Sequence, residues 1–120
     1  MIKERYVNFE VATLLRDKGF DECVHAWHNV YDKVNLDFRI AIDAPHLQIP
    51  APTQAMACDW LLEKYKIYID VSFVSGKGYV GTIYEISDFN EAFDIVETKY
   101  YSCIEPVYNE ALKYVLTNLI

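Results

Sequence analysis

The chain lacks the cysteine and glycine patterns on which many small binding sites depend. Its three cysteines, Cys23, Cys58 and Cys103, are widely spaced and include no CxxC pair. A disulfide framework or a zinc ribbon is therefore not expected, and reduced thiols in a cytosolic compartment fit best. Glycine is also rare. The Gly76-Lys77-Gly78 stretch lies between two strand-like segments, whereas a phosphate-binding loop joins a strand to a helix.

Basic side chains are scarce as well, because 11 lysines and arginines stand against 18 aspartates and glutamates, for a formal net charge of −7. Binding to a phosphate backbone or to an anionic membrane surface requires clustered cations. The charge balance therefore predicts no nucleic-acid and no membrane partner, and it favours solubility or a basic protein partner. Neither an apolar run of roughly 18 residues, as a membrane span needs, nor a signal-peptide pattern is visible. We expect a cytoplasmic protein.

What is present is the composition of one ordinary folded domain. The 120 residues are 52% hydrophobic and 24% charged, which is enough for a core that needs no metal or disulfide. The sequence shows no internal repeat, no low-complexity tract and no linker. We therefore expect a single domain over residues 1–120.

Apolar residues at helical spacing predict three helices. Asn8 and Thr53 are good N-caps for the first and second helix. The third helix starts either with a capping box of Ser102 and Glu105 or with Pro106 at its first position. The expected helices cover residues 9–18, 54–64 and 105–118.

Alternating apolar and polar residues predict two pairs of strands. The first pair is joined by a turn at 32–35 and the second by a turn at 75–78, and the prolines of 44–52 make that segment a loop. Residues 87–102 fit either a short acidic helix or an irregular segment that leads into a strand at 96–101. The expected strands are 22–34, 36–43, 67–74 and 79–86.

These elements predict an α+β fold in the order α-β-β-α-β-β-α. Four or five strands would form one largely antiparallel sheet, with the three helices packed against it in a two-layer or an α/β/α sandwich. The residues expected on the covered face of this sheet are Phe38, Ile40, Ile69, Val71 and Ile83.

No set of reactive side chains matches a known catalytic or metal-binding pattern. Cys23, His25 and His28 have the spacing Cys-x-His-x-x-His, but on a strand His28 points away from the other two. Cys103 lies at a helix start, where a thiolate can be activated, yet no histidine is near it in sequence. Asp70 is alone in its strand and is expected to be either solvated or paired.

The other acidic residues are expected to be solvated. One series recurs every third residue between 88 and 97, but it has neither the glycine nor the final glutamate of a calcium-binding EF-hand loop. We therefore predict no catalytic residue, no metal site and no cofactor. The residues considered and set aside are Asp32, Asp37, Asp43 and His46, together with Asp88, Glu91, Asp94 and Glu97.

Tyrosine is the one residue type in clear excess, with 10 copies. Tyr31, Tyr68 and Tyr84 lie on or near strand faces opposite the apolar residues. A sheet face that mixes aromatic and polar side chains is typical of a surface that a partner covers. The sequence therefore predicts an interaction face at Tyr31, Tyr68 and Tyr84, with coverage by the chain's own helices as the alternative.

Three segments resemble a family of small proteins encoded by phages and prophages, chiefly of Bacteroidetes. They are LLRDKGFDE at 14–22, APTQAMACDWLLEKY at 51–65 and NEALKYVLTNLI at 109–120. The resemblance implies an α/β sandwich, preferably of three layers, in the cytoplasm of a bacterial host. It implies no activity and carries no functional residue over to this chain.

Three hypotheses about function follow. The first is a non-enzymatic protein-interaction or self-associating module, because reactive constellations are missing and aromatic residues are abundant. The second is a small-molecule-binding protein or enzyme with a pocket between sheet and helices that uses Cys103, His25 or Asp70. The third is an acidic inhibitor of a protein that handles nucleic acid.

Overall fold

The structure is a computed structural model that describes residues 4–41, 45–88 and 91–120. Across these ranges it contains three helices and two antiparallel sheets of three strands, so the α+β class is confirmed. The helices are α1 (Phe9–Asp17), α2 (Gln54–Tyr65) and α3 (Ile104–Asn118), with one turn of 3-10 helix, η1 (Pro45–Leu47). The strands are β1 (Trp27–Asn29), β2 (Asp32–Asp37), β3 (Gln48–Pro50), β4 (Ile67–Val74), β5 (Gly78–Asp88) and β6 (Glu91–Glu97).

Side-chain caps fix the starts of the first two helices, as predicted. The Asn8 side chain accepts a hydrogen bond of 2.9 Å from the Val11 N–H, and the Thr53 hydroxyl accepts one of 3.1 Å from the Met56 N–H. Each bond satisfies one of the N–H groups that have no acceptor within the helix.

The third helix starts without such a bond. Its N-cap is Cys103, which makes no side-chain cap hydrogen bond, so a capping box with Ser102 as the cap does not form. Pro106 is the third helical residue and not the first. It is tolerated there because the N–H groups of the first turn have no acceptor within the helix.

The strands of the N-terminal half differ from the prediction. The chain turns at residues 30–31, and the expected turn residues 32–35 already belong to β2. Strand β2 ends at Asp37, so Phe38 and Ile40, which we expected on the covered face, are 61% and 60% exposed. An alternating pattern places side chains on faces only while the chain continues as a paired strand.

The proline-rich loop contains a short strand that the sequence did not indicate. Strand β3 pairs with β1 and lies at the edge of the sheet β2-β1-β3, a position at which Pro50 costs no ladder hydrogen bond. The Gln48 side chain joins this strand to the segment after β2. Its amide nitrogen donates to Asp37 and to the Arg39 carbonyl, and its oxygen accepts from the Ala41 N–H.

The second sheet contains the predicted hairpin of β4 and β5, with Ile69 opposite Ile83 and Tyr68 opposite Tyr84. Its third strand is β6, at a place where the sequence left open a short acidic helix or a later strand at 96–101. Tyr101 contributes only an isolated bridge to Tyr79.

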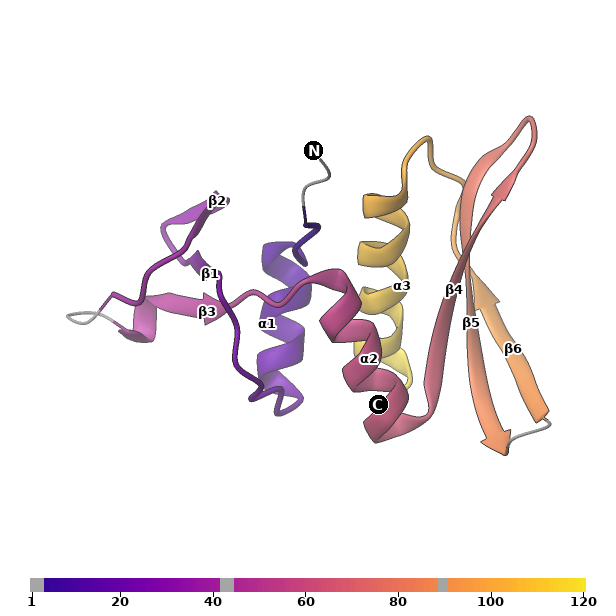
Figure 1. Cartoon of the computed structure of the whole chain (residues 1–120), viewed down its shortest axis with the longest axis horizontal. Helices are drawn as coiled ribbons and strands as arrows, with labels where there is room; N and C mark the ends of the chain where they lie inside the picture. Colours follow the sequence, from indigo (N-terminus) through magenta and orange to yellow (C-terminus); the bar gives the residue numbers. More distant parts are fainter. Residues whose placement is uncertain (1–3, 42–44, 89–90) are drawn as a thin grey trace.

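The two sheets are separate, so the single sheet of four or five strands does not form. In the described chain their strand orders are β2-β1-β3 and β4-β5-β6. Figure 1 shows the three helices between them, with β1–β3 beyond α1 and β4–β6 on the side of α2 and α3. Strands β1 and β3 have three residues each and a register shift interrupts the pairing of β1 with β2, so this sheet stays small.

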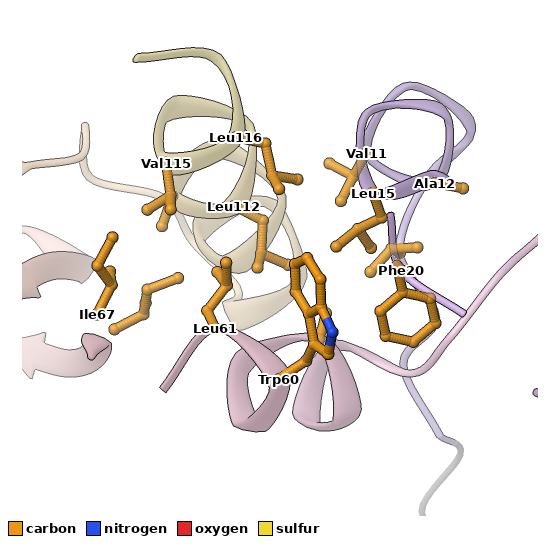
Figure 2. Packing of buried hydrophobic residues seen from close by; sticks show 14 of the residues in the cluster. Val11, Ala12, Leu15, Phe20, Trp60, Leu61, Ile67, Leu112, Val115 and Leu116 are labelled. Carbon is orange, nitrogen blue, oxygen red and sulfur yellow. The ribbon is translucent and has the colours of Figure 1, made fainter. Parts of the chain in front are cut away.

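The main core lies where the helices meet. Figure 2 shows Leu112 and Leu116 of α3 beside Leu15 of α1 and Leu61 of α2, and all four are fully buried. Trp60 packs edge-on against Phe20, with 5.4 Å between the ring centroids. Of the residues predicted on the covered sheet face, Ile69 and Ile83 are buried and Val71 is partly buried.

The approach of α3 to the sheet depends on Gly81. A Cβ atom at this residue would lie 2.8 Å from Cγ1 of Val107 and 3.3 Å from Cγ2 of Thr98. Val107 is fully buried, so it has no free space into which to move. The missing side chain therefore sets the distance between helix and strand.

The caps predict a difference between two alanine variants. Thr53→Ala removes a side-chain cap bond and should lower the free energy of unfolding by about 1 kcal/mol. Cys103→Ala removes none and should change it by less than about 0.5 kcal/mol. Urea unfolding followed by circular dichroism measures both, and equal losses would contradict the assignment of the caps.

The Gly81 contact predicts a loss of stability for Gly81→Ala of about 1–3 kcal/mol, because the new methyl group overlaps Val107. The control is the same change in a Val107→Ala background, where the methyl group has room and should cost less than about 0.5 kcal/mol. Urea unfolding of the four proteins gives the coupling. An equal cost of Gly81→Ala in both backgrounds would refute the steric explanation.

Candidate functional site

One face of the sheet β4-β5-β6 has no helix against it. Helices α2 and α3 pack on the face that carries Ile69 and Ile83, and Figure 1 shows no element of the described chain beyond the other side. Alternation along β4 and β5, and pairing across to β6, define the second face. We call it the outer face; its residues with described side chains are Tyr68, Asp70, Ser72, Val74, Val80, Thr82, Tyr84, Ile86, Asp94 and Glu97, of which Val80 and Thr82 are buried.

Two tyrosines lie side by side on the outer face. Tyr68 and Tyr84 are directly opposite in the register of β4 and β5, and their ring centroids are 6.4 Å apart at an interplanar angle of 34°. Tyr68 is 45% exposed and Tyr84 is partly buried. Tyr31, the third tyrosine of the predicted interaction face, lies in the turn between β1 and β2 and belongs to the other sheet. The structure therefore brings together two of the three predicted tyrosines.

Carboxylates surround this tyrosine pair. Asp94 is paired with Tyr84 across the strands, and its charge is the largest cause that raises the pKa of the Tyr84 hydroxyl. Burial, Asp70 and Glu97 raise the pKa further. The Tyr84 hydroxyl therefore stays protonated at neutral pH and remains a hydrogen-bond donor.

Asp70, which we expected to be solvated or paired, is a partly buried acceptor. The Ser72 hydroxyl donates to its Oδ2 atom at 3.2 Å. Asp94 and Glu97 reach the outer face through a register shift between Ile83 and Tyr84. Because a bulge of this kind leaves no clear pattern in one sequence, spacing alone could not assign these two acids to the face.

The Cys-x-His-x-x-His segment does not form a site. Cys23 and His25 are exposed, whereas His28 is buried and its Nε2 atom lies 2.8 Å from the Val7 carbonyl oxygen. The ring packs edge-on against Phe9, and its Nδ1 atom has no hydrogen-bond partner among the described residues. His28 thus joins β1 to the segment before α1, and the described residues do not bring its buried ring together with Cys23 and His25 as metal ligands.

Cys103 lies in an open hollow at the start of α3. Charged, polar, aromatic and aliphatic side chains line the hollow and none of them is an imidazole, so the thiol has no histidine base beside it in this hollow. Residues that line it are Arg5, Tyr79, Ser102, Cys103, Ile104 and Glu105.

Two of the remaining candidates have local structural contacts. Asp32 accepts hydrogen bonds from the backbone N–H groups of Asn35 and Val34, which lower the pKa of its carboxyl, and Asp37 accepts one from Gln48. His46 lies in η1, and Asp43 is outside the described residues. Within the described ranges no three histidine, cysteine, aspartate or glutamate side chains come together as metal ligands would.

The three thiols are predicted to differ in reactivity. Burial, and then the charge of Asp59, raise the pKa of Cys58 to about 12, which leaves only about one thiolate in ten thousand at pH 8. Ellman's reagent should therefore titrate Cys23 and Cys103 within minutes, since both are exposed, and Cys58 only after denaturation. Three fast thiols in the native protein would contradict the packing around Cys58.

Comparison of the chain with models of protein families, with curated proteins and with solved structures finds no match. The resemblance to phage and prophage proteins therefore stays a prediction. In the described part of the chain, no helix combines the length and the apolar character that crossing a bilayer requires.

Proposed function

We propose that the protein is a non-enzymatic protein-interaction module and that the outer face of β4-β5-β6 is its docking surface. The observation that carries this proposal is the uncovered sheet face on which Tyr68 and Tyr84 lie in ring contact. The phage setting and the cytoplasm of a bacterial host enter the proposal through the sequence resemblance alone.

The physical basis is the character of the surface. Tyrosine rings contribute a large contact area at a low cost in side-chain entropy, and their hydroxyls form hydrogen bonds at the edge of a contact. The sheet beneath them is held by the core through Ile69 and Ile83, so the two rings are presented on a rigid support.

The alternative functions have less support. An enzyme or small-molecule binder of the predicted kind would use Cys103, His25 or Asp70. These residues lie at the start of α3, before β1 and on β4, and the hollow that contains Cys103 includes neither of the other two. Self-association through the outer face would place Asp70, Asp94 and their neighbours against the same carboxylates of a second copy.

The proposal predicts that removing the tyrosine rings strongly weakens partner binding. Wild-type protein and Tyr68→Ser/Tyr84→Ser would be immobilised and exposed to lysate of the organism that carries the gene, and captured proteins would be quantified by mass spectrometry. A specific partner should lose more than about 30-fold in affinity for the double variant, because a buried tyrosine is a typical hot spot.

The matched control is Tyr31→Ser, because Tyr31 is 84% exposed but belongs to the other sheet. It should capture the partner as the wild type does. Circular dichroism melting curves would show that all variants are folded. A partner retained by Tyr68→Ser/Tyr84→Ser, or lost with Tyr31→Ser alone, would refute the outer face as the docking surface.

A further inference from the structure

The sheet β4-β5-β6 has charge of one sign only. Its three strands contain no lysine, arginine or histidine, although such residues make up a large share of the charged side chains elsewhere in the chain. The lysines nearest in sequence flank the strands and lie outside them. Lys66 precedes β4, Lys77 lies in the turn after β4 and Lys99 follows β6. The acidic residues of the three strands are Asp70, Glu85, Asp88, Glu91, Asp94 and Glu97.

The acids with outer-face positions flank the tyrosine pair. Asp94 is opposite Tyr84, Glu97 is opposite Thr82, and Asp70 is opposite Thr82 from the other side. The central strand β5 thus has a carboxylate residue beside it on each neighbouring strand. Among the lysines nearby, Lys77 is directed elsewhere, since its Nζ atom lies 5.4 Å from the centre of the Tyr100 ring.

This charge distribution selects among partners. A second copy of the chain would bring like charges together, and a nucleic acid would oppose its phosphates to the same carboxylates. A cationic segment gains from both features of the face, because its charges meet carboxylates and its guanidinium groups stack on tyrosine rings. Lysine offers the charge without the planar group.

We propose that the outer face docks an arginine-bearing basic segment of another protein, with guanidinium groups against Tyr68 and Tyr84 and ion pairs to Asp70, Asp94 and Glu97. This inference rests on the proposed function and adds the chemical class of the partner. The specificity is set by two independent features of the face, its negative charge and its aromatic surface.

The test uses a fluorescein-labelled hexa-arginine peptide and the intact protein, with binding followed by fluorescence anisotropy. Binding should be saturable and should weaken as sodium chloride rises from 20 to 300 mM, on the order of tenfold or more, because salt screens the ion pairs. A hexa-lysine peptide should bind at least about threefold more weakly than hexa-arginine, since it cannot stack on tyrosine.

Two variants with the same change in net charge locate the binding site. Asp70→Asn/Glu97→Gln changes the outer face and should weaken hexa-arginine binding about tenfold. Asp21→Asn/Glu22→Gln changes exposed residues after α1 and should weaken it less than about twofold. Tyr68→Ser/Tyr84→Ser should bring hexa-arginine to the affinity of hexa-lysine.

The proposed arginine-bearing partner is refuted if hexa-arginine does not bind, if both charge variants lose affinity equally, or if hexa-lysine binds as tightly as hexa-arginine. The lysate capture experiment separates this result from the proposed function. Capture that still depends on Tyr68 and Tyr84 would show a docking surface for a partner of different chemistry, whereas capture that is independent of them would refute the docking surface itself.

Discussion

The architecture depends on a single layer of three helices that supplies the apolar contacts for two sheets. Helix α3 is the central member, because Leu112 and Leu116 join the cluster formed with α1 and α2, and Val107 lies against β5 at Gly81. One layer of helices can cover only one face of each sheet. The other face of β4-β5-β6 therefore has no helix against it, and the proposed function follows from this limit.

The lack of a second helix layer also explains why the outer face mixes aromatic and acidic side chains. A fully apolar face with no element covering it would favour aggregation. A fully charged face would offer a partner little apolar contact area. Tyr68 and Tyr84 provide area, while Asp70 and Asp94 keep the face hydrated in the free protein.

The sequence was sufficient to predict the helices and the β4-β5 hairpin. Asn8 and Thr53 mark the helix starts, and the turn at 75–78 fixes the register that places Tyr68 beside Tyr84. Long amphipathic segments and tight turns are local features, so one sequence contains the information that determines them.

Features that depend on contacts between distant segments could not be predicted in this way. The alternation at Phe38 and Ile40 continues beyond the end of β2, because the pattern does not show where strand pairing stops. The division into two sheets depends on which helix each hairpin packs against. The place of Asp94 on the outer face depends on the register shift before Tyr84.

The distribution of the cysteines has a consequence for handling the protein. Cys23 and Cys103 are exposed, and Cys58 is sheltered within α2. Oxidation by air can therefore link copies of the chain through either exposed thiol and leave the interior unchanged. A reductant cleaves the disulfide of such covalent dimers, so they can be distinguished from any non-covalent association through the sheet.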